Sequence, residues 1–135
     1  MMTTPCPPRE QPLILIVDDD ADILEATREF LQLNGFNVIT AEDGGVGLDL
    51  ALEERPDLML IDLALPVIDG LEVVKRMKSM AATTKILVMA FTGHAFGSNS
   101  AEARSAGFDA VFTKPGKPPD LLRKVRALLT RVALG

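Results

Sequence analysis

Cysteine and histidine are nearly absent from this chain of 135 residues, which contains one of each, Cys6 and His94. A single cysteine excludes an internal disulfide, and this pair alone supplies too few ligands for a structural zinc site. No apolar run approaches the roughly 20 residues that span a bilayer, and the N-terminus lacks the apolar segment of a signal peptide. We therefore expect a cytoplasmic protein that does not associate with membranes.

Positive charge is also in short supply. The chain has 14 basic and 19 acidic residues, for a net charge of −5, so it lacks the basic surface that nucleic-acid binding requires. The hydrophobic share of 47% and the charged share of 24% are ordinary for one globular domain. Four prolines occur within residues 1–12 and oppose regular structure, so we predict a disordered tail there and a folded domain over 13–133.

From residue 13 onward, aliphatic runs alternate with amphipathic segments. The aliphatic runs predict strands at 13–17, 36–41, 58–61, 86–91 and 110–113. Helical spacing predicts a helix at about 21–33, a second one in the segment that follows the second strand and ends at Glu54, and a third at about 71–80. It also predicts a short helix ending at Gly107 and a last helix from about Asp120, after two prolines. This alternation indicates an α/β fold, a doubly wound five-stranded parallel sheet with five helices.

Polar residues follow four of the predicted strands. They are Asp18, Asp19 and Asp20 after the first strand, Asp62 after the third, Thr92 after the fourth and Lys114 after the fifth. In open parallel sheets, functional groups gather at the carboxyl ends of the strands. We therefore expect these side chains to lie together at one edge of the sheet.

The types of residue at this edge indicate phosphoryl chemistry. Carboxylates about 4 Å apart repel by about 4 kcal/mol at an effective dielectric of 20, so the cluster requires a cation or a raised pKa. Oxygen ligands with open positions favour Mg²⁺. A lysine beside such a cation favours a phosphoryl group as the anion, and a neighbouring carboxylate is able to attack it and form an acyl phosphate. Helix capping is the alternative role for Asp18 and Asp19.

Several short motifs occur together and in order. They are Val17-Asp18-Asp19, the run Leu60-Ile61-Asp62-Leu63-Ala64-Leu65-Pro66 with Asp69-Gly70, Thr92, and Lys114-Pro115. Over about residues 13–133 this set resembles the receiver domains of bacterial two-component response regulators. The resemblance implies a flavodoxin-like sheet with strand order 2-1-3-4-5.

The resemblance also implies a role for each matching position. Asp62 is the expected phosphoacceptor, and Asp18, Asp19, Asp62 and the carbonyl of Ala64 are the expected Mg²⁺ ligands. Thr92, Gly93 and Lys114 are expected to bind the phosphoryl group, and Ala64 and His94 to tune how long it survives.

One position departs from the family pattern. Receiver domains often have an aromatic residue three positions before the lysine, where its rotamer follows phosphorylation, and this chain has Val111 there with Phe112 beside it. The side chain of valine is too small for a rotamer change as large as that of an aromatic ring. We therefore expect signalling to use the segment from His94 to Ala106, which is rich in glycine, serine and asparagine.

The expected function is that of a single-domain response regulator. A sensor histidine kinase or phosphotransfer protein would donate the phosphoryl group, and a downstream protein would receive the signal. The resemblance also implies partner or homodimer contacts through the fourth helix, fifth strand and fifth helix. We expect no enzyme activity beyond self-catalysed phosphorylation and slow autodephosphorylation, and we expect no output domain because the sequence stops after the last helix.

Four alternatives compete with this function. A receiver excised from a hybrid kinase and an unphosphorylated adaptor both remain open. A phosphatase of the haloacid dehalogenase type requires a second aspartate two residues after its nucleophile, and this chain has Ala64 there, which disfavours this alternative. A flavodoxin-type electron carrier requires a phosphate-binding loop rich in hydroxyl groups after the first strand. This chain has three acidic residues there, and their charge excludes this alternative.

Overall fold

The computed structural model describes residues 11–63, 65, 67–92, 105–113 and 117–134. Its elements in chain order are β1 (Leu13–Val17), α1 (Ala21–Leu33), β2 (Asn37–Ala41), α2 (Gly44–Glu54), β3 (Leu58–Ile61), α3 (Gly70–Lys78), β4 (Leu87–Thr92), β5 (Ala110–Thr113) and α5 (Pro118–Leu134). The predicted strands match these bounds to within one residue. Most of the predicted tail lies outside the described residues.

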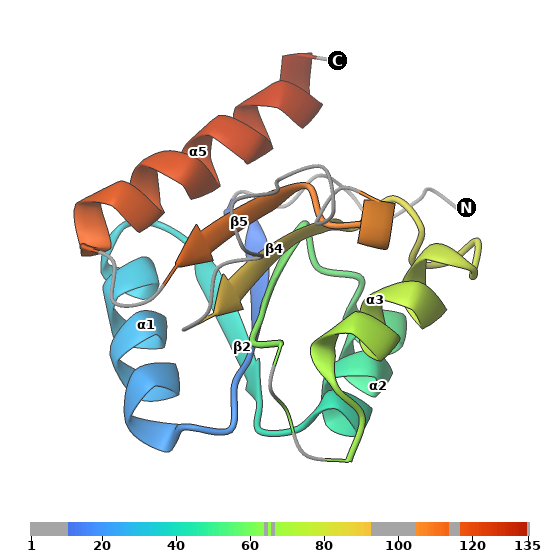
Figure 1. The fold of residues 1–135 in the computed structure, drawn as a ribbon. Helices are drawn as coiled ribbons and strands as arrows, with labels where there is room; N and C mark the ends of the chain where they lie inside the picture. Colours follow the sequence, from blue (N-terminus) through green and yellow to red (C-terminus); the bar gives the residue numbers. More distant parts are fainter. Residues whose placement is uncertain (1–10, 64, 66, 93–104, 114–116, 135) are drawn as a thin grey trace, which may run out of the picture.

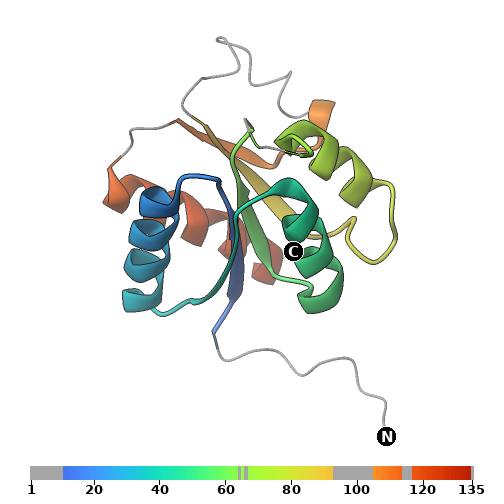
Figure 2. The same ribbon diagram turned by 90° about the horizontal axis from the view of Figure 1, so that it is seen from below.

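The strands form one parallel sheet with the order β2-β1-β3-β4-β5. Helices α1 and α5 cover one face of this sheet, and α2 and α3 cover the other (Figures 1 and 2). The α/β fold and the strand order are therefore confirmed. The described residues contain four of the five predicted helices; the other falls mostly on residues outside the description, and of it only Ser105 and Ala106 are described as helical.

Two hydrophobic clusters hold the layers together, one on each face of the sheet. In β1, Ile14 and Ile16 pack toward α1 and α5, whereas Leu15 and Val17 pack toward α2 and α3. All four side chains are fully buried. A central strand with helices on both faces has no solvated side, which explains why its sequence is a continuous aliphatic run.

Aspartates directly precede three of the helices and cap their N-termini. The side chain of Asp20 accepts hydrogen bonds from the N–H groups of Asp22 and Ile23 at the start of α1. Asp43 and Asp69 cap α2 and α3 in the same way. Each cap satisfies backbone donors that have no partner within the helix, so each helix starts at a defined residue.

The predicted start of the last helix is wrong by two residues, because α5 begins at Pro118 and not at Asp120. Proline lacks an N–H group and has a φ angle suited to a helix, so the first turn tolerates it. Pro118 and Pro119 therefore belong to the helix that we expected them to precede. None of the helices within the described ranges has the length and apolarity to span a bilayer.

Candidate functional site

The acidic residues after β1 and β3 lie side by side because these strands are neighbours. Val17 and Ile61 are partners in the parallel register, and Asp18 and Asp62 are the next residues along each strand. The N–H of Asp62 donates to the carbonyl of Val17 at 2.9 Å, so the ladder extends one residue beyond the strand. The backbone of the sheet therefore determines where both carboxylates begin.

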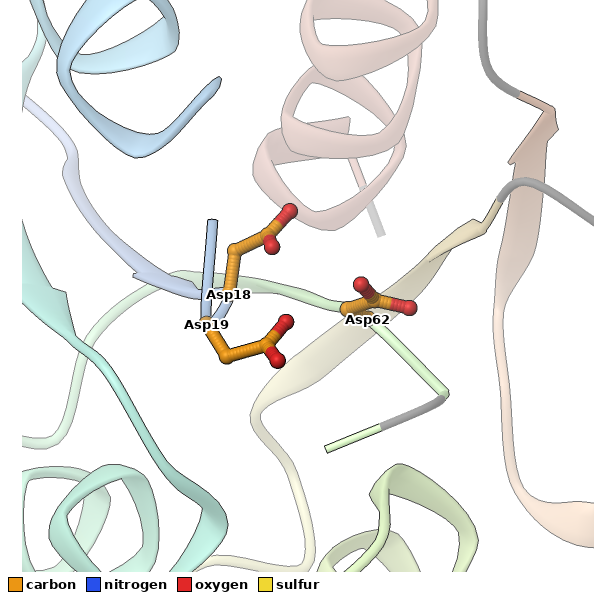
Figure 3. A group of neighbouring side chains, drawn as sticks. All are labelled: Asp18, Asp19 and Asp62. Atoms are coloured by element: carbon orange, nitrogen blue, oxygen red, sulfur yellow. The ribbon is translucent and has the colours of Figure 1, made fainter. Parts of the chain in front are cut away.

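The side chains of Asp18, Asp19 and Asp62 form a compact cluster (Figure 3). One carboxylate oxygen from each lies within 4.8 Å of the others. Asp18 is fully buried, Asp62 is 9% exposed and Asp19 is exposed. The predicted meeting of these three residues at one edge of the sheet is confirmed.

The donor set of this cluster fits a hard cation. Three carboxylates at this separation repel one another, and the two buried ones have little water to screen them. A site with only a few carboxylate ligands leaves positions for water or a phosphoryl oxygen, as Mg²⁺ sites in proteins usually do. Asp18, Asp19 and Asp62 are therefore suited to hold Mg²⁺.

The three consecutive aspartates divide into two roles. Asp20 caps α1, whereas Asp18 and Asp19 belong to the cluster with Asp62. Asp18 also accepts a hydrogen bond from the N–H of Asp20 at 2.9 Å, which ties the cluster to the helix start. Capping, the alternative role for Asp18 and Asp19, thus applies to the third aspartate instead.

The structure describes only some of the predicted site residues. Ala64, Gly93, His94 and Lys114 lie outside the described residues, as does most of the segment from His94 to Ala106. The backbone of Thr92 ends β4 and pairs with Thr113, but its side chain is not described. The roles of all these residues stay predictions.

Phe112 does not replace the missing aromatic at position 111. Val111 is half-buried on the face covered by α2 and α3, whereas Phe112 packs in the cluster with α1 and α5. There Phe112 is only 6% exposed, and its ring centroid lies 5.7 Å from that of Phe91. Successive strand residues point to opposite faces of the sheet. A rotamer change of Phe112 would therefore take place on the face opposite to that of position 111.

Gly70 supports the site in a way that the sequence did not reveal. A Cβ atom at this position would lie 2.5 Å from the carbonyl oxygen of Asp62, which no real side chain tolerates. Its N–H also donates to the carbonyl of Leu63 at 3.1 Å, closing the loop that follows β3. From the sequence, Asp69-Gly70 was only a loop signal and part of the family motif.

The comparisons with known proteins agree with this geometry. A family model described as the response regulator receiver domain matches residues 14–126. The chain belongs to the response regulator receiver domain family. This assignment confirms the resemblance noted from the motifs.

Curated relatives of this receiver domain are longer proteins. Response regulator MprA of Mycolicibacterium vanbaalenii is 39% identical over 118 residues, which cover 87% of this chain and 50% of the relative. Transcriptional regulatory protein PrrA of Mycobacterium tuberculosis is 36% identical over 120 residues, which cover 89% of this chain and 51% of the relative. The chain thus spans about half the length of these relatives.

Solved structures of receiver domains superimpose closely on this chain. A CheY-like receiver domain protein from Methanospirillum hungatei is 34% identical with a TM-score of 0.83, covering 90% of this chain and 96% of that one. Chemotaxis response regulator CheY4 of Vibrio cholerae is 27% identical with a TM-score of 0.81, covering 87% and 98%. Both similarities extend over nearly the whole domain.

Proposed function

We propose that this receiver domain accepts a phosphoryl group on Asp62 from a phosphohistidine of a sensor histidine kinase or phosphotransfer protein. The observation that supports this proposal is the convergence of Asp62 with Asp18 and Asp19, whose carboxylate oxygens lie within 4.8 Å. Such a cluster favours the binding of a cation, and phosphoryl transfer requires positive charge beside the nucleophile.

Exposure favours Asp62 over Asp18 as the nucleophile. Asp18 is fully buried, so a phosphohistidine on another protein has no access to it. Asp62 is 9% exposed, so part of this residue reaches the surface. Asp19 is exposed, and in the family pattern its position is that of a metal ligand.

The transfer itself is a displacement at phosphorus. A carboxylate oxygen of Asp62 forms the new bond to phosphorus as the bond from phosphorus to the imidazole nitrogen breaks, and the electron pair returns to that nitrogen. Mg²⁺, when bound, supplies positive charge that offsets the carboxylates and the phosphoryl oxygens. Asp18 and Asp19 would hold it together with Asp62, and the ammonium of Lys114 is the predicted second positive charge.

The output of the protein also belongs to this proposal. We infer that the domain acts in the cytoplasm as a single-turnover switch without true enzyme activity, and that a downstream protein recognises its phosphorylated form. Homodimerisation through the predicted fourth helix, β5 and α5 stays a prediction. Because the curated relatives are about twice as long, a receiver that works within a larger protein, including a hybrid kinase, remains the alternative, as does an unphosphorylated adaptor.

Intact-mass measurement tests the proposed phosphoacceptor. The protein is incubated with acetyl phosphate and Mg²⁺, and we expect a gain of one phosphoryl group that Asp62→Asn abolishes and a chelator prevents. Asp22→Asn is the matched control, since Asp22 is an exposed aspartate of α1 outside the cluster. Phosphorylation of the Asp62→Asn protein would disprove the assignment, and release of free phosphate far beyond stoichiometry would indicate an enzyme instead.

A further inference from the structure

We propose that Gly44, the first residue of α2, is a positioning residue for the loop that follows Asp62. This inference rests on the proposed function of Asp62. Figure 1 shows the start of α2 at the same end of the molecule as the chain that enters α3. The contact between them is made by backbone atoms.

The contact leaves no room for a side chain at position 44. A Cβ atom there would lie 2.1 Å from the carbonyl oxygen of Ile68 and 3.1 Å from its carbonyl carbon. It would also lie 3.0 Å from a methyl group of Val73 in α3. Backbone atoms cannot rotate away as a side chain can, so any larger residue must move either α2 or the loop.

The two ends of this loop meet at Gly70, which stands two residues after Ile68. The N–H of Gly70 bonds to the carbonyl of Leu63, and Gly70 packs directly on the carbonyl of Asp62. Between them, Val67 adopts a φ of 71°, a left-handed conformation that restricts the chain further. We therefore expect a displacement of Ile68 to reach Asp62 through Gly70.

The first turn of α2 is also fixed by a cap at its start and by a close contact with β1. Asp43 caps its first turn by accepting the N–H of Val46 at 2.8 Å. A Cβ atom on Gly47 would lie 2.9 Å from a methyl group of Val17, the residue before Asp18. The start of α2 therefore contacts both the strand end that leads to Asp18 and the loop that follows Asp62.

Alanine substitutions within one helical turn test this role. Gly44→Ala forces a Cβ atom against the backbone of Ile68, whereas Gly45→Ala meets only a carboxylate oxygen of Asp43 at 3.3 Å. Both changes add the same methyl group to the same turn, so Gly45→Ala is the matched control. Gly47→Ala is intermediate, because it meets only the side chain of Val17.

Two properties are measured at a temperature where thermal unfolding shows every variant to be folded. They are the Mg²⁺ dissociation constant by isothermal titration calorimetry, and the rate of phosphorylation by acetyl phosphate at saturating Mg²⁺. For Gly44→Ala we expect Mg²⁺ binding to weaken and the rate to fall by about tenfold or more, since a misplacement of about 1 Å costs up to about a hundredfold. For Gly45→Ala we expect the Mg²⁺ dissociation constant and the phosphorylation rate to stay within about twofold of those of the parent chain, a change well below the loss expected for Gly44→Ala.

The outcomes separate the inference from the proposed function. A merely structural glycine would lower the melting temperature but leave the Mg²⁺ affinity of the folded protein unchanged, and equal affinities and rates for Gly44→Ala and Gly45→Ala would overturn the inference. If the parent chain gains no phosphoryl group, the proposed function fails while the Mg²⁺ titration still tests the positioning. If Gly44→Ala does not fold, Gly47→Ala decides, and Mg²⁺ affinity equal to that of Gly45→Ala refutes the role of α2.

Discussion

Neutralising Asp19 should stabilise the protein when no divalent cation is present. Two unit charges 4.8 Å apart, the distance within which one carboxylate oxygen of each residue lies from the others, repel by about 0.9 kcal/mol in water and about 3.5 kcal/mol at an effective dielectric of 20. Asp19 is exposed, so the lower figure applies to each of its two neighbours, Asp18 and Asp62. Asp19→Asn should therefore relieve about 2 kcal/mol of repulsion.

The effect is measured by thermal unfolding in a chelator and again in excess Mg²⁺. For a domain of this size, 2 kcal/mol corresponds to a rise in melting temperature of about 5–10 °C. Mg²⁺ should stabilise the parent chain by mass action and stabilise Asp19→Asn less, because the variant has lost a ligand. The advantage of the variant should therefore shrink or reverse as Mg²⁺ is added.

The control for this prediction is Asp22→Asn in the first turn of α1. Asp22 lies outside the cluster, and its charge interacts favourably with the helix N-terminus, so its neutralisation should cost about 0.3–1 kcal/mol. The two variants should thus shift the melting temperature in opposite directions. A melting temperature of Asp19→Asn in chelator at or below that of the parent chain would refute the crowding of the three carboxylates.

Two further predictions concern stability away from the carboxylates. Val67→Gly should stabilise the fold by about 0.5–1 kcal/mol in urea unfolding, because it relieves about 1–2 kcal/mol of left-handed strain, loses little packing from a side chain that is 85% exposed, and costs about 0.5–1 kcal/mol in backbone entropy. Val67→Ala keeps a Cβ atom and should gain less, whereas a destabilised Val67→Gly would argue against the strain. Thr83→Val should destabilise the fold by about 1 kcal/mol, because the fully buried Thr83 hydroxyl donates to the Met77 carbonyl at 2.8 Å. Thr83→Ser retains that donor and should differ from Thr83→Val; equal unfolding midpoints for the two would show that the hydrogen bond contributes nothing.

Local patterns in the sequence were sufficient for the secondary structure and for the fold class. The run from Leu13 to Val17 is aliphatic because both of its faces are buried, and that requirement is legible without coordinates. The start of α5 was misjudged because proline has two local meanings, a helix breaker and a first-turn residue. The strand order came from the resemblance and not from periodicity, since pairing between distant strands leaves no local pattern.

The sequence by itself determined that acidic side chains would stand at the carboxyl ends of β1 and β3, because strand boundaries and residue types are local properties. Only the tertiary structure decided how they are used: it assigned Asp20 to the cap of α1 and brought Asp18 and Asp19 to Asp62. It alone revealed the contact of Gly44 with Ile68. Such contacts join segments that are distant in the chain, and their spacing depends on how whole helices pack on the sheet, which no run of neighbouring residues encodes.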